Sequence, residues 1–265
     1  MSPYISDYLR YGWQLFNGFR ANGEREIDAL RQKDLAPYLD YTAPLSILDL
    51  ANGRLRPQYM LLKAVGHKVY GIDLVNRPRL NYANLGYAFA RTIYAWKLAL
   101  QTETRKSRTL LCGDVGVLPF RECTFDLITS VAAFEHFLDV SSVVSELHRV
   151  LRPGGLAWVG IHLFTCISGG HNLSFTQIPL RSIPKGIDPW DHLRKRQLPF
   201  HVPLNQWRRD QYLEVFARRF EILKRYCAMR EGEEMLTPQI EAELSGYSRD
   251  ELTCGSYVIL ARKAL

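Results

Sequence analysis

The stretch SILDLANGRLRP, residues 46–57, combines a short apolar strand with a turn and the start of a helical segment. The strand carries Asp49 near its end, and the turn contains Gly53. An apolar strand, an acidic residue and a glycine-containing turn before a helix are typical of loops that cradle a nucleoside cofactor. Such loops normally carry three glycines, and this one retains only Gly53. The stretch therefore predicts a cofactor loop in an altered form.

The segments after this loop alternate between apolar strands and amphipathic helices. The expected strands are SILDL (46–50), KVYGIDLV (68–75), RTLLCGD (108–114), FDLITSV (125–131) and LAWVGIHL (156–163). The expected helices between them cover residues 57–66, 84–101 and 140–155, and the last is expected to close at Pro153 and the glycines after it. A helix near 206–219 and strands near 220–228 and 255–264 follow. This order predicts an α/β fold, a Rossmann-like doubly wound sheet that is mostly parallel with an antiparallel last strand.

Two segments stand outside this alternation. Residues 1–45 contain two amphipathic helical stretches and are predicted to form an N-terminal helical cap or a homodimer surface. Residues 164–205 are rich in proline, glycine and histidine without a clear period, as in functional loops of compact domains. We predict that residues 46–265 form one domain and that residues 164–205 are its lid.

Composition narrows the class of protein. The chain has 265 residues, 47% of them hydrophobic and 23% charged, which is the range of a globular protein with a core. The net charge of +7 is compatible with an anionic partner, but dispersed basicity makes nucleic acid an unfavoured one. Asp7 and Arg10 interrupt any secretory signal, and the longest apolar run is too short to span a bilayer. Five cysteines without a C-x-x-C pair indicate reduced thiols, so we expect a cytoplasmic protein.

Acidic residues end three of the predicted strands. In an open parallel sheet, ligands bind beyond the carboxyl ends of the strands, where Asp49, Asp73 and Asp114 would lie. Asp73 follows Gly53 at the spacing where an acid accepts hydrogen bonds from ribose hydroxyls, although a turn or helix-capping role fits equally well. Asp114 stands where an acid can accept from an adenine amino group, with the amide of Val115 facing the ring.

Four motifs together resemble one family. ILDLANG, VYGIDLV, GDVGVLPFRECTFDLITSVAAFEHF and ELHRVLRPGGLAWV occur in the order and at the spacings of class I S-adenosylmethionine-dependent methyltransferases. The resemblance covers residues 46–163 and is greatest to the branch that methylates small molecules. Each motif alone is common, whereas four in register are specific. The resemblance implies a methyltransferase that uses S-adenosyl-L-methionine.

The resemblance also implies roles for particular residues. The acid at Asp73 would hold the ribose and the acid at Asp114 the adenine. The methionine end of the cofactor would be lined by Asp49, Ala51 and Gly53, and the methyl group would be bordered by Ala132 and Phe134.

The loop departs from the family pattern Asp-x-Gly-x-Gly-x-Gly at two positions. Ala51 replaces the first glycine, which is compatible with the turn if its φ is negative. Leu55 replaces the third and is expected to alter the packing or start of the following helix. We predict that cofactor binding is retained in a weaker or reshaped site. A dinucleotide oxidoreductase would need G-x-G-x-x-G at this turn, and the loop lacks that pattern.

The transfer step requires an aligned acceptor and, for a hydroxyl, a base with a pKa near neutrality. The candidates are His136, His162, His171 and His192, and those predicted to be catalytic are His171, His136 and His192. His171 follows two glycines in the loop after the fifth strand, which normally faces the acceptor; anchoring that loop is an equal alternative. The spacings of His162, His171, His192 and His201 match no compact ligand motif, so no metal is predicted.

The acceptor is predicted to be a small molecule or glycan that is methylated at oxygen. Basic residues at 194–196 and at Arg208 and Arg209 would suit an anionic acceptor, although a solvated basic face explains them as well. Trp190, Phe200 and Trp207 could provide sugar-stacking walls, although such side chains more often pack in a core. One alternative is a degenerate cofactor-binding relative that regulates or scaffolds a partner. Another is an RNA methyltransferase, but no asparagine–proline–proline–tyrosine motif follows the fourth strand.

Overall fold

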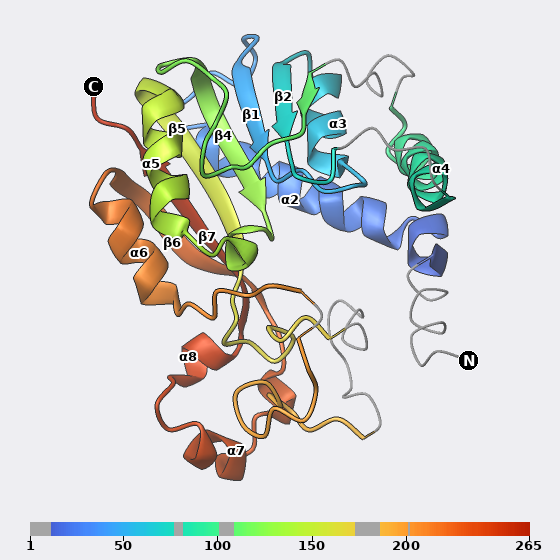
Figure 1. The fold of residues 1–265 in the computed structure, drawn as a ribbon, viewed down its shortest axis with the longest axis vertical. Helices are drawn as coiled ribbons and strands as arrows, with labels where there is room; N and C mark the ends of the chain where they lie inside the picture. Colours follow the sequence, from blue (N-terminus) through green and yellow to red (C-terminus); the bar gives the residue numbers. More distant parts are fainter. Residues whose placement is uncertain (1–11, 77–81, 101–108, 173–185, 201) are drawn as a thin grey trace.

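The computed structural model describes residues 12–76, 82–100, 109–172, 186–200 and 202–265. Its strands are β1 (Ser46–Leu50), β2 (Lys68–Ile72), β3 (Leu110–Leu111), β4 (Phe125–Val131), β5 (Leu151–His162), β6 (Glu221–Arg230) and β7 (Cys254–Arg262). They form one seven-stranded sheet in the order β3-β2-β1-β4-β5-β7-β6 (Figure 1). The pairings from β3 to β5 are parallel, and β7 runs antiparallel to both β5 and β6. The predicted sheet and its antiparallel last strand are confirmed.

Helices cover both faces of the sheet because alternate strand residues point to opposite sides. Leu48, Ile128 and Val159 pack with α5 (Val140–Val150) and α6 (Arg209–Ala217) in one core cluster. Ile47, Leu127 and Trp158 pack on the other face in a second cluster. The helices of that face are α2 (Phe19–Leu35), α3 (Pro57–Ala64) and α4 (Tyr82–Lys97). The remaining short helices, α7 (Pro238–Glu243) and α8 (Arg249–Leu252), lie beyond the end of the sheet toward which β4 points (Figure 1).

The boundary between α5 and β5 and the length of β3 differ from the predicted ones. Helix α5 ends at Val150, and the Arg-Pro-Gly-Gly stretch after it already belongs to β5. The reason is that Leu151 pairs with Phe125 of β4, which draws the chain into the sheet before the proline. The third strand is reduced to Leu110–Leu111 at the edge of the sheet, where it has a single neighbour.

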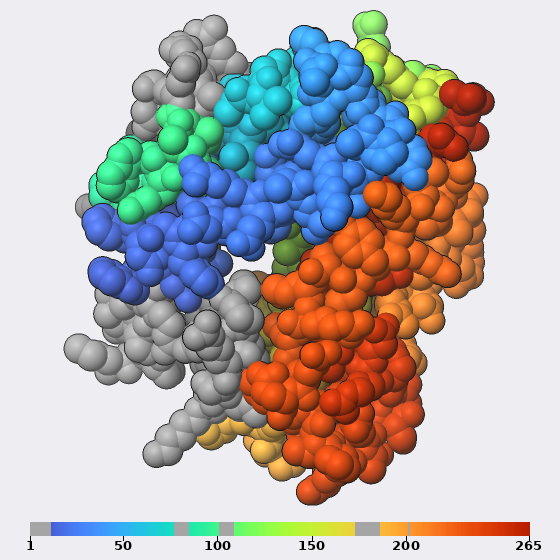
Figure 2. Space-filling view, turned by 180° about the vertical axis from the view of Figure 1, so that it is seen from behind, coloured from blue at the N-terminus to red at the C-terminus, as the bar shows by residue number. Residues whose placement is uncertain are grey.

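Helix α2 is joined to the body of the domain by buried polar contacts. Asp34 accepts hydrogen bonds from Trp158 Nε1 (3.0 Å) and the hydroxyl of Tyr226 (2.5 Å), both on the sheet. Arg31 is fully buried and donates to Gln58 Oε1 of α3 at 2.7 Å. Figure 2 shows α2 in blue across the back of the molecule, between α4 and the C-terminal strands. A cap or dimer role for residues 1–45 stays a prediction, and residues 1–11 lie outside the described part.

The described ends of the predicted lid are packed into the domain. Ile167 and Trp190 are buried in a third apolar cluster with Leu236, Ile240 and residues around them from α7 and α8. Trp190 also donates from Nε1 to the carbonyl of Leu252 at 3.2 Å. Trp190 therefore serves as a core residue, and residues 173–185 and His201 lie outside the described part. Among the described helices, none is long and apolar enough to cross a membrane.

Candidate functional site

The strand order reverses between β1 and β4, and ligands of open parallel sheets bind at the carboxyl edge at such a point. Asp49 lies near that end of β1, and a turn carrying Ala132 and Glu135 follows β4. Beside them, β5 ends at His162. Because β1, β4 and β5 are parallel neighbours, the structure brings these residues to one edge.

The loop after β1 is held by Asp73, the acid that directly follows β2. The amide of Gly53 donates to Asp73 Oδ2 at 2.8 Å, and the amide of Val75 donates to Asp73 Oδ1 at 2.8 Å. Gly53 has a φ of +65°, and no atom lies within 4 Å of the position that a Cβ would take there. The loop backbone is thus open to a ligand. Asp73 caps the turn through these two hydrogen bonds, and it also lies beside the loop, where the ribose is predicted to bind.

Ala51 has a backbone conformation that glycine adopts more readily than alanine does. Its φ is +53°, in the left-handed region that alanine rarely occupies, so the condition of a negative φ is not met. Leu55 packs against the second core cluster, and Arg56, also left-handed with a φ of +57°, precedes α3. The altered loop therefore keeps the glycine-type turn and gains a packed side chain in place of the third glycine.

Glycine at position 51 is expected to stabilise the protein. The change Ala51→Gly removes a left-handed alanine and should raise the free energy of unfolding by about 1 kcal/mol, with cofactor affinity unchanged or higher. Chemical denaturation measures the first quantity and calorimetric titration with S-adenosylmethionine the second. The control Ala88→Gly, in the middle of α4, should destabilise by about 0.5–1 kcal/mol. A loss of affinity in Ala51→Gly would show that the alanine methyl fits a reshaped pocket.

Asp49 and Asp114 differ in their surroundings. Asp49 is 3% exposed, and its Oδ2 has no hydrogen-bond partner among the described residues. Burial raises the pKa of Asp49 to about 7, although Arg31 lowers it in part. Asp114 is exposed and accepts from the amide of Gly116 at 2.8 Å, and the neighbouring Val115 is buried in the core. Binding of adenine by Asp114 and the Val115 amide stays a prediction.

Beside this loop, the structure gathers a glutamate and three histidines. Glu135 is fully buried, and neither of its carboxylate oxygens has a hydrogen-bond partner among the described residues. Its Oε1 lies 3.8 Å from His171 Nε2 and 3.9 Å from His136 Nε2. The His171 ring lies 4.7 Å from the His136 ring and 4.8 Å from the His162 ring, between centroids. We call Glu135, His136, His162 and His171 the edge cluster.

Burial dominates the electrostatics of the edge cluster. It raises the pKa of Glu135 to about 8, because the charged form of a carboxyl is disfavoured away from water. It lowers the pKa of His171 to about 2, and the neighbouring histidines add to this shift. His171 is therefore neutral at physiological pH, and its Nε2 has no hydrogen-bond partner in the described part of the chain.

Two local structures position the cluster. The side chain of Asn205 donates to the carbonyls of Phe134 (2.8 Å) and Phe137 (3.0 Å). The backbone amide of Asn205 donates to the carbonyl of Glu135 (2.9 Å). On the other side, a Cβ at Gly169 would lie 2.2 Å from the carbonyl oxygen of Phe164. The glycines before His171 therefore permit close packing, and His171 itself holds a left-handed φ of +52°. Such strain is typical of functional positions.

The other predicted site residues take different places. His192 is buried and donates from Nε2 to the carbonyl of Phe164 at 2.7 Å, and burial lowers its pKa to about 4. The Phe134 side chain is buried against Phe137 and Phe216, and Ala132 is exposed with a φ of +48°. The contacts of Ala132 and Phe134 with a methyl group, and a catalytic role for His192, stay predictions.

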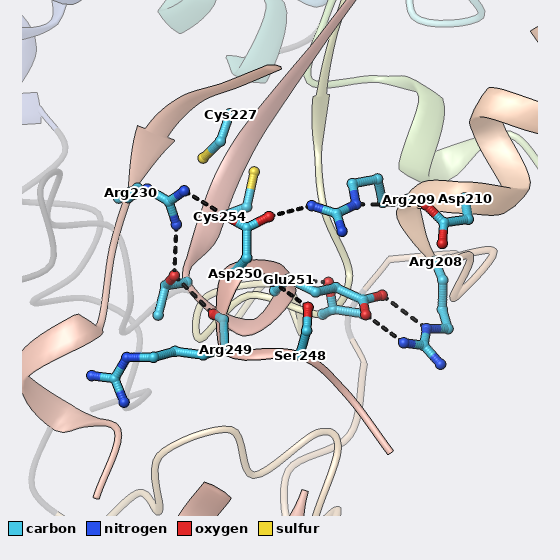
Figure 3. A network of polar contacts seen from close by, with 12 residues as sticks. Arg208, Arg209, Asp210, Cys227, Arg230, Ser248, Arg249, Asp250, Glu251 and Cys254 are labelled. Atoms are coloured by element: carbon cyan, nitrogen blue, oxygen red, sulfur yellow. Dashed lines mark hydrogen bonds and ion pairs between the residues drawn. The ribbon is translucent and has the colours of Figure 1, made fainter. Parts of the chain in front are cut away.

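Four of the five basic residues considered for an anionic acceptor have carboxylate partners, and the fifth, Arg196, donates from Nε to the carbonyl of His192 at 3.2 Å. Arg208 pairs with Glu251, and Arg209 lies 2.5 Å from Asp250, which also accepts from Arg230 (Figure 3). Arg194 and Lys195 pair likewise with Glu243 and Asp188. These ion pairs neutralise the charges that would attract an anion, so an anionic acceptor has no support from these residues.

Sequence reasoning missed two contributors to this site. Glu135 is not among the predicted site residues, because nothing in the letters FEHF shows that its carboxyl group is buried. Glu231 is also absent from the predicted site residues; its Oε1 accepts from Ser168 Oγ at 2.5 Å, and that hydroxyl lies 2.8 Å from His162 Nε2. Ser168 also lines a small pocket together with Gly170, His192 and Phe200, among others.

Comparisons with known proteins agree with this architecture. Residues 48–159 match the family model described as a methyltransferase domain. A sterol 24-C-methyltransferase of Gibberella zeae is 30% identical over 66% of this chain and 44% of its own length. A demethylmenaquinone methyltransferase of Lactococcus lactis is 32% identical over 49% of this chain and 47% of its own length. The chain thus spans about half the length of the curated relatives that it matches.

Solved structures share the fold at low sequence identity. An S-adenosylmethionine dependent methyltransferase from Mesorhizobium loti superposes with a TM-score of 0.51 at 21% identity, covering 87% of this chain and 96% of that one. The PH0226 protein from Pyrococcus horikoshii OT3 gives a TM-score of 0.50 at 19% identity, covering 89% and 91%. At such identities the likeness shows the fold alone.

Proposed function

We propose that this chain, which carries a class I S-adenosylmethionine-dependent methyltransferase domain, transfers a methyl group to a hydroxyl oxygen of a small molecule. The family predicted from the four sequence motifs is confirmed by the match over residues 48–159. The observation that supports the transfer is the shared edge: the cofactor loop at Gly53 and the edge cluster lie at the carboxyl ends of neighbouring strands.

The residues present fit the cofactor. Gly53 leaves open space above its backbone, and Asp73 lies beside the loop. Asp49 offers a buried carboxylate oxygen without a partner in the described structure. These residues would hold S-adenosylmethionine, with the ribose at Asp73 and the methionine end at Asp49 and Gly53. When bound, it supplies an electrophilic methyl carbon; the acceptor oxygen bonds to this carbon, the C–S electron pair stays on sulfur, and the hydroxyl proton leaves.

The edge cluster would serve the acceptor. Its partly buried imidazoles provide ring nitrogens where a hydroxyl must lose a proton, and burial lowers the pKa of both His162 and His171. A pKa of about 2 weighs against His171 as an unaided base, because such a nitrogen holds a proton poorly at neutral pH. We therefore propose that the cluster activates the hydroxyl as a unit.

The relatives support one part of the proposed acceptor, namely that it is a small molecule. The similar proteins are named for a sterol and for demethylmenaquinone, which are small molecules, and this supports a small-molecule acceptor here. Methylation at oxygen rests on the cluster. The proposed acceptor class includes glycans. The alternative is a relative that binds the cofactor without catalysing transfer, and the following experiment distinguishes it from an active enzyme.

The test combines cofactor binding with a product assay. Calorimetric titration of the purified chain with S-adenosylmethionine should show one site, and mass spectrometry should find cofactor or its demethylated product carried through purification. A screen of phenolic, sterol-like and glycan acceptors with methyl-labelled cofactor then identifies the methylated atom. Absence of binding at millimolar cofactor would overturn the proposal. Binding without transfer to any acceptor would favour the regulatory alternative.

Cofactor affinity is expected to rise with pH around neutrality. Burial raises the pKa of Asp49 to about 7, and the positive charges of S-adenosylmethionine favour the ionised carboxylate. The dissociation constant should therefore fall by roughly three- to tenfold between pH 6 and pH 8. Calorimetric titrations across this range measure the slope, and Asp49→Asn should flatten it. An unchanged slope in Asp49→Asn would assign the titration to another group.

The same raised pKa has an opposite consequence for stability. The folded state holds the Asp49 proton more tightly than the unfolded chain does, so this contribution is present below the unfolded pKa near 4 and is lost as pH rises through about 7. Without cofactor, Asp49→Asn should therefore be more stable than wild type at pH 8 and differ less at pH 5. Thermal unfolding at both pH values measures the difference.

A further inference from the structure

Three polar atoms of the edge cluster face one another at distances too long for hydrogen bonds, namely Glu135 Oε1, His136 Nε2 and His171 Nε2. His136 donates from Nδ1 to the carbonyl of Pro203 at 2.9 Å, because a carbonyl can only accept. Its other ring nitrogen, Nε2, faces Glu135 Oε1 at 3.9 Å. His171 Nε2 faces the same oxygen and has no hydrogen-bond partner among the described residues. Atoms that converge in this way form a ligand set for a metal ion, which displaces any proton that the ligands hold when it binds.

The spacing favours a metal ion over a shared proton. Glu135 Oε1 lies 3.8 Å from His171 Nε2, which is too long for a hydrogen bond. Two ligands of one ion lie about 3.0–4.2 Å apart, because each bond is about 2.1 Å long. The ligand atoms of Glu135, His162 and His171 all lie within 4.8 Å of one another, so small side-chain rotations bring them onto one ion.

His162 has the outer contacts of a metal ligand. Its Nε2 lies 2.8 Å from Ser168 Oγ, and that hydroxyl donates to Glu231 Oε1 at 2.5 Å. The bond leaves Nδ1 as the ring nitrogen that can bind an ion. Histidine ligands of metals usually donate their second N–H to such a polar chain, which fixes the ring and its tautomer.

We propose that Glu135, His162 and His171 form a binding site for a divalent first-row transition metal ion, with Zn²⁺ as the expected occupant. Two imidazoles and one carboxylate suit Zn²⁺ better than Mg²⁺ or Ca²⁺, which prefer all-oxygen sites. The ion would stabilise the ionised form of the buried Glu135 carboxyl, whose oxygens have no hydrogen-bond partner among the described residues. The three ligands come from a turn, a strand end and a loop, so they do not form a compact sequence motif.

A metal ion at this site would have a chemical role in the proposed methyl transfer, and that role rests on the proposed function. Three protein ligands leave a coordination position open, as in catalytic zinc sites. An acceptor hydroxyl bound there would lose its proton to solvent more readily, because the ion stabilises the oxyanion. The oxyanion would then be the nucleophile at the carboxyl edge of the sheet, and His171 would be a ligand rather than the base.

The test measures metal binding directly, on the full chain without a histidine tag. Chelator-treated protein is dialysed against Zn²⁺ or Co²⁺ and the bound metal is counted by mass spectrometry, with visible absorption reporting Co²⁺ coordination. Wild type should bind one equivalent, and Glu135→Gln and His171→Asn should each bind more than about 100-fold more weakly. Ser168→Ala should bind about 10–100-fold more weakly. The control His148→Gln, on α5, should bind like wild type.

Circular dichroism and cofactor titration of each variant keep the outcomes separate. Folded wild-type protein that binds no Zn²⁺ or Co²⁺ at micromolar concentration would overturn the site, as would equal binding by Glu135→Gln. Loss of cofactor binding would overturn the proposed function and leave the metal count standing. Stoichiometric metal whose removal leaves methyl transfer unchanged would overturn the chemical role of the ion.

Discussion

Replacement of His171 by alanine is expected to slow methyl transfer by about 10²–10⁴-fold while the affinity for S-adenosylmethionine stays nearly unchanged. His171 faces Glu135 at 3.8 Å in the edge cluster, whereas the predicted contacts to the ribose and the methionine end lie on β1 and in the loops after β1 and β2. Loss of the imidazole therefore removes an acceptor-side group and leaves the cofactor loop intact. Single-turnover rates with an acceptor from the screen and parallel titrations measure the two quantities.

The matched variant His171→Asn separates chemistry from loop anchoring. His171 has a left-handed φ of +52°, which asparagine tolerates better than alanine does. If the imidazole serves the reaction, the asparagine and alanine variants should both be slow although the former is more stable. Turnover of His171→Asn at the wild-type rate would show that the residue only anchors the loop. His148→Ala, remote on α5, should leave both quantities unchanged.

Replacement of Asp73 by alanine is expected to weaken cofactor binding by roughly 1.5–3 kcal/mol, or about 10–150-fold. The carboxylate accepts from the amides of Gly53 and Val75 at 2.8 Å each, so it holds the loop as well as offering lone pairs to a ribose. Alanine removes both functions. Calorimetric titration with S-adenosylmethionine gives the change in affinity.

Asp73→Asn distinguishes the two contributions of this residue. The amide oxygen can still accept one loop N–H, so part of the affinity should return if loop geometry dominates. Affinities as low as those of the alanine variant would point to the charge. Asp40→Ala, in the exposed loop before β1, serves as the control and should bind cofactor like wild type. Unchanged affinity in Asp73→Ala would remove this residue from the cofactor site.

Local sequence patterns determined the sheet and the cofactor loop. Apolar runs at 46–50, 125–131 and 156–163 alternate with helical periods, and such patterns reflect contacts within each element and its immediate neighbours. Asp49, Gly53 and Asp73 also lie within one strand–turn–helix–strand unit, so their proximity follows from the order of the chain. The hydrogen bond from Gly53 to Asp73 is therefore a tertiary contact that the sequence could indicate.

Only the tertiary structure decided the features that depend on distant segments. The left-handed φ of Ala51 is set by how the loop fits between strand and helix, and the letter alone allows a negative φ. The charges at Arg208 and Arg209 are cancelled by carboxylates about 40 positions later in the chain. No periodicity encodes such pairings, because each depends on where the excursion after β6 folds back.

The edge cluster shows this division most clearly. The sequence marked its histidines one by one as candidates, since residue type alone suggests proton transfer or metal binding. It could not show that Glu135, His162 and His171 meet, because they belong to a turn, a strand end and a loop joined only through the parallel pairing of β4 with β5 and the packing of the segment after β5. Chain order fixed which residues reach the carboxyl edge of the sheet, and long-range packing fixed which of them touch, because a buried contact depends on the shapes of all the segments that surround it.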